Sequence, residues 1–164
     1  MTRLQSITQS IAQGVTALAF TAVLTAAGAQ AKDPVIGTWV LNLEKSRFNP
    51  GPAPKSQTRV YVKAGDKTTG TFTGVNADGS PLKIAFTAAA DGKDYAYTGD
   101  ATADNISFRR VDAYTTEATV KKGAIIVHTA TREISKDDKT MTVTITMKDV
   151  NGKPLKSVLV FDRK

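Results

Sequence analysis

The side chains that most often carry catalysis or bind metals are scarce in this chain. It has no cysteine and a single histidine, His128, among 164 residues. Without cysteine there is no thiol catalysis, thiolate metal site or thiol switch, and one histidine cannot form a clustered metal site. The sequence motifs of serine hydrolases, zinc peptidases and phosphate-binding loops are missing, and the acidic pair Asp137-Asp138 is typical of a turn. The sequence therefore predicts no enzyme, no cofactor and no metal.

Arginine and tyrosine are the polar side chains that could hold a ligand instead. A guanidinium is planar and can bind a carboxylate or a phosphate through two parallel hydrogen bonds. With a period of two, Arg110 lies on the same face as Ile106 and Phe108, and Arg132 lies on the same face as Ile126. Each polar candidate could equally be a solvated or structural residue. The candidate ligand-binding residues are Arg110, Arg132, Tyr95, Tyr97, Phe86 and Phe108.

Strands must position these side chains, because apolar and polar residues alternate in many short segments. In residues 140–147 the odd positions are apolar and the even positions are threonine, as expected of a strand with one buried face. Similar alternation occurs in residues 58–63, 81–87, 106–110 and 124–134, separated by Asp-Gly and Asn-Gly turn signals. The predicted fold is all-β: a single up-and-down antiparallel barrel of 8–10 strands, closed because closure removes exposed edges.

The interior of such a barrel has two possible uses. Eight-stranded barrels are just wide enough to be filled by side chains or to hold one small ligand. The inward-facing apolar sets would be Leu82, Ile84 and Phe86, then Ile106 and Phe108, then Met141, Val143, Ile145 and Met147. They would form a packed core or line a cavity, and the sequence leaves both interpretations open.

The first 31 residues have the features of a secretory signal peptide. Arg3 is their only charged side chain, residues 15–27 are predominantly apolar, and small residues stand at Ala29 and Ala31. The apolar run is shorter than the roughly 20 residues that a transmembrane anchor needs. We therefore expect cleavage after Ala31, a periplasmic or secreted protein, no integral membrane span after cleavage, and one domain over residues 32–164.

The mature chain would be basic but not strongly patterned. The formal net charge of the whole chain is +7, and removing Arg3 leaves +6. Adjacent pairs such as Arg109-Arg110 and Lys121-Lys122 are too short to resemble a nucleic-acid-binding arm. Such a charge could also favour anionic lipid or polyanionic envelope polymers, but the scattered basic residues favour a solvated surface. We expect no nucleic-acid partner.

Residues 49–54, with the sequence Asn-Pro-Gly-Pro-Ala-Pro, interrupt the alternating pattern. Proline fixes φ and lacks a backbone donor, so this segment should be an extended connection. Too few mature residues precede it to form a domain, which argues against an interdomain linker. We interpret the segment as a loop that crosses one end of the barrel.

Gly37, Thr38 and Trp39 open the first strand-like segment and match a Gly-x-Trp motif. A Gly-x-Trp start in a small β-barrel resembles the lipocalin and fatty-acid-binding superfamily, the calycins. Ser46, Phe48 and the closing segment 155–163 are similar to the fatty-acid-binding branch. Over nearly the whole mature length the chain resembles exported bacterial lipocalin-like proteins.

This resemblance implies a structural signature rather than an activity. It implies that Trp39 plugs one end of the barrel, with Gly37 before it and Arg163 as its partner. It also implies that His128 could ligate iron, as in calycin-like barrels that hold haem. The proline-rich segment stands where the fatty-acid-binding branch has a helical lid, so the resemblance does not carry over a ligand.

Three function classes are consistent with these observations. The first is an exported soluble β-barrel that binds a small apolar or amphiphilic molecule, which we take as the expectation. The alternative is a protein-interaction module of the cell envelope, for example a protease-inhibitor-like barrel, with the proline-rich loop or the strand edges as its contact. A structural envelope protein with no ligand is the third. The threonine and charge on the outward faces disfavour an integral outer-membrane barrel.

Overall fold

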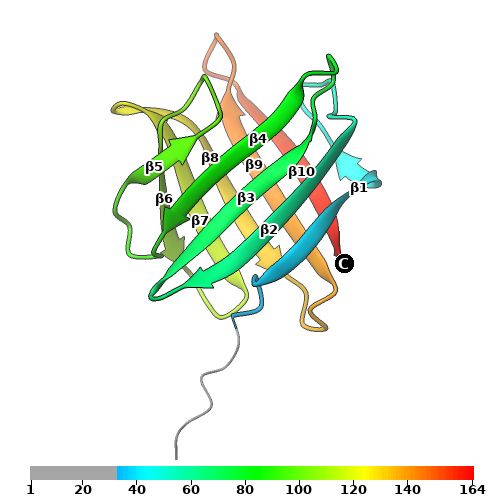
Figure 1. Cartoon of the computed structure of the whole chain (residues 1–164). Helices are drawn as coiled ribbons and strands as arrows, with labels where there is room; N and C mark the ends of the chain where they lie inside the picture. The colour runs from blue at the N-terminus through cyan, green and yellow to red at the C-terminus, as the bar shows by residue number, and fades with distance from the viewer. Residues whose placement is uncertain (1–32) are drawn as a thin grey trace, which may run out of the picture. The chain divides into compact units, whose positions relative to one another are not determined.

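The computed structural model describes residues 33–164, which form ten β-strands and no helix (Figure 1). The signal peptide predicted for residues 1–31 and its cleavage site lie outside the described residues. The strands are β1 (Gly37–Arg47), β2 (Ser56–Ala64), β3 (Lys67–Val75), β4 (Pro81–Ala88), β5 (Tyr95–Thr98), β6 (Asn105–Arg110), β7 (Thr115–Lys122), β8 (Ile125–Ile134), β9 (Thr140–Lys148) and β10 (Pro154–Arg163).

Alternation and turn chemistry explain most of these strands. In β9, Met141 and Val143 are buried while the threonines between them are half-buried or exposed, and a branched Cβ suits a pleated surface. The turn into β10 contains Asn151 and Gly152, and Gly152 adopts φ 79°. Glycine reaches this left-handed region at no steric cost, so the chain can reverse there and pair β9 with β10.

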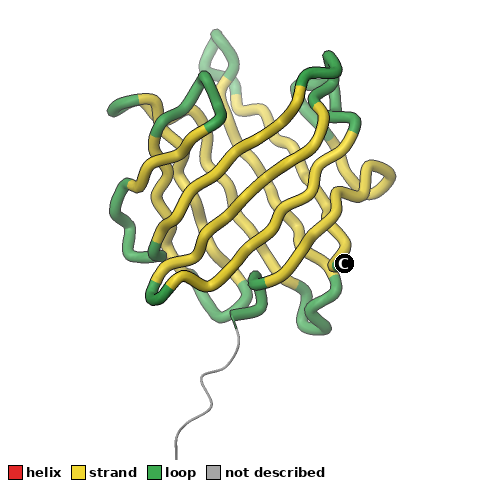
Figure 2. Tube along the Cα trace, in the orientation of Figure 1, coloured by secondary structure: helices red, strands yellow, loops and turns green. Residues whose placement is uncertain are grey.

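The strands form one closed antiparallel barrel. Each strand pairs with the next along the chain, and β10 pairs with β1, for example at Trp39 and Arg163 (Figures 1 and 2). The prediction of an up-and-down barrel of 8–10 strands is confirmed, with ten strands. Because the chain reverses at every turn, the turns after β2, β4, β6 and β8 share the end that holds Trp39, which we call the Trp end.

The Trp end is a packed core. Trp39, Met141 and Phe161 are fully buried, and the Trp39 indole Nε1 donates to the Val35 carbonyl at 2.8 Å. The Arg163 guanidinium carbon lies 4.1 Å from the Trp39 ring centroid, and its Nη1 donates to the carbonyl of Ile36 at 2.9 Å. Side chains therefore pack tightly around Trp39 at this end of the barrel.

The segment between β1 and β2 contains no strand or helix and crosses the opposite end of the barrel. The Asn49 N–H donates to the Ser157 hydroxyl at 2.8 Å, and that hydroxyl donates back to the Asn49 carbonyl at 3.0 Å. These two bonds tie the start of the loop to β10. The loop therefore stays close to the rim.

One sequence-based face assignment was wrong. Ile126 was expected on the same face as Arg132, but its side chain is 59% exposed. The pairing of β7 with β8 shifts between Val120 and Lys121, so that Val120 faces His128 while Lys121 faces Ile126. The extra residue in β8 changes the side-chain alternation, which leaves His128 and Arg132 on the inner face and turns Ile126 outwards.

Candidate functional site

A cavity of about 590 Å³ occupies the barrel between its packed Trp end and the loops at the opposite end. Its wall includes Pro52 and Pro54 of the β1–β2 loop and Asp100 of the β5–β6 turn, so we call this end the mouth end. The barrel interior thus combines both expected uses. Met141 belongs to the packed core, whereas Val143 and Ile145 of the same strand line the cavity.

Aromatic rings form much of the wall towards the Trp end. The Phe86 centroid lies 5.6 Å from that of Phe72 and 5.1 Å from that of Phe108. Phe86 can occupy this position because Gly70 lies beneath it: a Cβ at residue 70 would stand 2.3 Å from Phe86 Cζ. Aliphatic residues complete the lining, namely Leu82, Ile84, Ile106, Val120, Val143, Ile145 and Leu159.

Arg59 of β2 is a buried cation in this otherwise largely apolar wall. Its side chain is 8% exposed, and its guanidinium carbon lies 4.3 Å from the Phe72 centroid and 4.5 Å from that of Phe161. Its Nε donates to Gln57 Oε1 at 3.1 Å. Among residues 33–164, no carboxylate forms an ion pair with Arg59.

Arg132 of β8 is a second cation without an acidic partner in the described part of the chain. Its guanidinium carbon lies 5.0 Å from the Tyr61 centroid and 5.8 Å from that of Phe108. It lines the main cavity and also a smaller cavity of about 250 Å³ at the Trp end. The main cavity therefore has two guanidinium groups in its wall.

Burial shifts the pKa values of two further groups in the wall, Tyr97 and His128, towards the neutral form. Burial raises the pKa of Tyr97 to about 12, although the positive charge of Arg59 opposes the shift. Burial lowers the pKa of His128 below its usual value of 6.5; the charge of Arg59 adds to this shift and that of Asp100 opposes it. Arg59 and Arg132 thus supply the positive charge of the inner wall, while Asp78 and Asp100 lie at the mouth.

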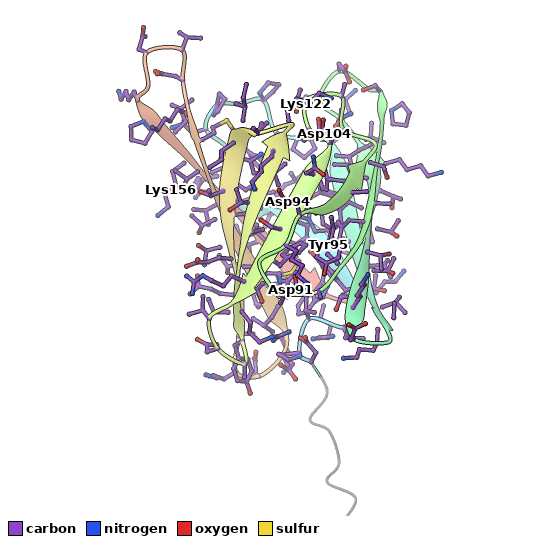
Figure 3. All side chains as sticks on the ribbon, turned by 90° about the vertical axis from the view of Figure 1, so that its left-hand side faces the viewer. Asp91, Asp94, Tyr95, Asp104, Lys122 and Lys156 are labelled. Atoms are coloured by element: carbon purple, nitrogen blue, oxygen red, sulfur yellow. The ribbon has the colours of Figure 1, made fainter. Side chains whose placement is uncertain are left out.

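The structure brings four of the six predicted ligand-binding residues to the main cavity: Arg132, Tyr97, Phe86 and Phe108. Arg110 lines the smaller cavity instead and forms an ion pair with Asp33. Tyr95 lies outside both cavities, and its hydroxyl donates to Asp91 at 2.9 Å, beside which it stands in Figure 3.

Sequence reasoning missed Arg59 and Gln57. In β2 the side chains of Gln57, Arg59 and Tyr61 are buried, whereas Val62 is 53% exposed. The strand thus presents polar groups to the interior and valines to the outside. A strand whose alternation runs opposite to hydrophobicity breaks a local rule of folding, and such breaks concentrate at functional sites.

Within residues 33–164, no three histidine or acidic side chains come close enough together to hold a metal ion. Nor does that part of the chain form a helix of the length and apolarity needed to cross a membrane.

Comparison with known proteins gives matches at the level of the fold. No protein-family profile matches the chain, and no curated protein sequence does. Among solved structures, zebrafish ileal bile acid-binding protein complexed with cholic acid is 13% identical, with a TM-score of 0.50 over 80% of this chain and 99% of that one. Lobster apocrustacyanin A1 (TM-score 0.47) and apocrustacyanin C2 (TM-score 0.46) are also 13% identical over 82% of this chain, which spans 63% of their length.

The chain therefore folds as a closed antiparallel barrel that is lipocalin-like and similar to the zebrafish protein. The ten strands of this chain form a closed barrel, and the similarity to the zebrafish protein concerns the fold alone. Within that fold, the cavity and its two arginines define the candidate site.

Proposed function

We propose that this protein binds a small amphiphile, with the apolar body of the ligand in the main cavity and an anionic head group at Arg59. The observation that carries the proposal is a buried guanidinium in a cavity wall, with no carboxylate paired to it within residues 33–164. A buried charge is costly unless it is paired and hydrogen-bonded. A carboxylate or phosphate would supply both the opposite charge and the acceptor oxygens.

The cavity suits the apolar part of such a ligand. Its volume of about 590 Å³ lies within the range of roughly 300–1,000 Å³ that is usual for small-molecule sites. Most of its wall is aromatic or aliphatic, and burial of an apolar chain against that wall would contribute about 25 cal/mol per Å². The arginines give this site a preference for anions, while the wall supplies most of the contact area.

The position of the proline-rich loop supports ligand binding over the protein-interaction alternative. Pro52 and Pro54 contribute to the wall of the cavity, so the loop belongs to the cavity mouth. The zebrafish protein, which has a similar fold, is complexed with cholic acid, an amphiphile with a carboxylate. We also propose that the protein acts outside the cytoplasm, on the basis of the signal-peptide features of residues 1–31.

Native mass spectrometry of the protein purified from the periplasm of an expression host tests this proposal. We expect an additional mass that remains on the folded protein and leaves on denaturation, and we expect anionic amphiphiles to raise the melting temperature with the logarithm of their concentration. An empty barrel that gains no stability from anionic, neutral or cationic amphiphiles would contradict the proposal. Amino-terminal sequencing of the same sample tests cleavage after Ala31.

A further inference from the structure

Two neighbouring hairpins at the mouth end carry exposed aliphatic side chains at their tips. Ile125 and Ile126, at the turn between β7 and β8, are 73% and 59% exposed, and Val150, between β9 and β10, is 100% exposed. The pairing of β8 with β9 stops at Thr129 and Thr146. Beyond that pair the two hairpins continue separately: the β9–β10 hairpin projects above the barrel in Figures 1 and 3, and the β7–β8 turn extends at the upper left edge in Figure 1.

These side chains are not needed to make the turns. Gly123 and Gly152 supply the positive φ angles, and Asp149 accepts hydrogen bonds from the N–H groups of Asn151 and Lys153 at 2.9 and 2.8 Å. Single exposed aliphatic residues are ordinary, but a group of them at one end of a molecule marks an interaction site. Polar residues would form these turns equally well. The aliphatic side chains are therefore better explained by contact with a binding partner.

The charges of the β9–β10 hairpin favour an anionic partner. Lys148, Lys153 and Lys156 form no ion pair within the described residues, and Asp149 is the one acidic residue between them in the sequence. Lys122 lies 3.7 Å from Asp104 in an exposed ion pair, next to the other tip. Figure 3 shows Lys122 at the top of the barrel and Lys156 at the side of the projecting hairpin.

We propose that these two hairpin tips dock the protein on an anionic lipid surface. Ile125, Ile126 and Val150 would enter the boundary between head groups and acyl chains, and the lysines of the β9–β10 hairpin would lie near the anionic head groups. Membrane binding strengthens with the apolar area that enters this boundary and with the attraction of nearby cations to anionic lipid. A stable protein interface instead buries about 800 Å² on each partner, whereas the exposed aliphatic group here consists of Ile125, Ile126 and Val150.

The docking would place the mouth of the cavity against the lipid. His128 and Ile145 line the cavity, and they lie in the strands that lead to the two tips. In this respect the inference rests on the proposed function, because a carrier of a poorly soluble amphiphile must exchange it with membranes. Docked in this way, the barrel would receive or release its ligand with little exposure of the apolar chain to water.

Sedimentation with vesicles tests the docking surface. The protein would be residues 32–164, because all ten strands pair within this range and the apolar residues 15–27 would bind lipid by themselves. Vesicles of phosphatidylcholine alone are compared with vesicles of equal parts phosphatidylcholine and phosphatidylglycerol. We expect binding to the anionic vesicles, at least tenfold weaker for Ile125→Ser/Ile126→Ser. Lys148→Gln/Lys153→Gln/Lys156→Gln should remove most of the preference for anionic lipid.

The control is Val62→Ser/Val111→Ser, which removes two valines of 53% and 48% exposure from the Trp end; its binding should equal that of the wild type. Absence of vesicle binding, or equal losses in both serine double variants, would overturn the inference. So would a dimer in analytical ultracentrifugation that Ile125→Ser/Ile126→Ser dissociates, because a second copy would then cover the tips.

A parallel titration with dodecanoate in solution separates this inference from the proposed function. Dodecanoate should bind equally to the wild type and to Ile125→Ser/Ile126→Ser, since the tips lie outside the cavity wall. Dodecanoate binding without vesicle binding overturns the docking surface alone. Vesicle binding without binding of dodecanoate supports the docking surface and contradicts the proposed ligand site.

Discussion

In the proposed function, Arg59 gives a largely apolar cavity its preference for anionic ligands. Its guanidinium is held between the rings of Phe72 and Phe161 and is hydrogen-bonded to Gln57, so its position is fixed before a ligand arrives. Fixed polar groups reduce the cost of ordering on binding. At the residue scale, the candidate site therefore consists of Arg59, which neighbouring side chains hold in place, a second cation at Arg132, and a largely apolar wall around them.

Trp39 has a structural role at the other end of the barrel. We predict that Trp39→Ala lowers the free energy of unfolding by about 3–5 kcal/mol, because it removes a fully buried ring that packs under Arg163. Urea denaturation measures this loss. Val40→Ala, at the next residue, is the matched control, because Val40 is 41% exposed and should lose little stability. A loss below about 1 kcal/mol for Trp39→Ala would show that the ring is not a structural plug.

His128 should make the stability of the protein depend on pH. Its pKa is lowered by burial in the folded state, so near pH 6 the unfolded chain binds a proton that the folded chain does not. The free energy of unfolding should therefore fall as the pH falls below about 6.5, down to the folded pKa.

The test is to compare urea denaturation of the wild type and His128→Gln at several values between pH 7.5 and pH 5. The difference between their stabilities should change with pH, with the wild type losing more on acidification. The aspartates with lowered pKa, such as Asp78 and Asp137, respond at lower pH and are present in both proteins. Parallel curves would contradict the assignment of His128.

At the scale of the elements, Gly70 of β3 makes room for the aromatic wall. A Cβ at this position would stand 2.3 Å from Phe86 Cζ, and the Phe86 ring is in turn packed against Phe72 and Phe108. We predict that Gly70→Ala costs about 1–3 kcal/mol, the usual cost of overpacking, and weakens ligand binding because the ring must move.

Thermal and urea denaturation give the stability, and a ligand titration gives the affinity. Gly51→Ala is the control, since a Cβ at residue 51 meets no atom within 4 Å. Equal stability of the two variants would show that Phe86 has room to move without cost.

The elements also show what the sequence could and could not predict. Strict alternation and Asn-Gly turns made β9 and its hairpin predictable, and the Gly-x-Trp motif indicated the plug. The shift in β8 was not predictable, because an extra residue leaves no mark in the hydrophobic pattern. Nor was the bulge in β1, where the pairing with β10 shifts between Asn42 and Arg47 and the Ser46 hydroxyl donates to the Asn42 carbonyl and accepts from the N–H of Val160. Arg59 was missed because β2 turns its polar residues inwards, against the rule that the prediction uses.

At the scale of the whole molecule, the two ends of the barrel differ in structure and in proposed role. At the Trp end the Trp39 ring is fully buried against Arg163, which the resemblance to calycins led us to expect, and the smaller cavity lies at the same end. The mouth end holds the cavity, the proline-rich loop and the two projecting hairpins. Whether a barrel of this size is filled or hollow depends on side-chain packing across strands that are distant in sequence, and alternation along one strand does not contain that information.

The most direct test of the central claim is calorimetric titration of ligand-free protein with dodecanoate, dodecyl phosphate and the uncharged methyl dodecanoate. A charge-assisted hydrogen bond contributes about 1.5–3 kcal/mol, so we predict that at least one anion binds one-to-one and about ten- to a hundredfold more tightly than the ester. Arg59→Met should abolish this preference while keeping the fold, as monitored by urea denaturation. Equal affinities for the ester and the anions, or a preference that survives Arg59→Met, would contradict the account.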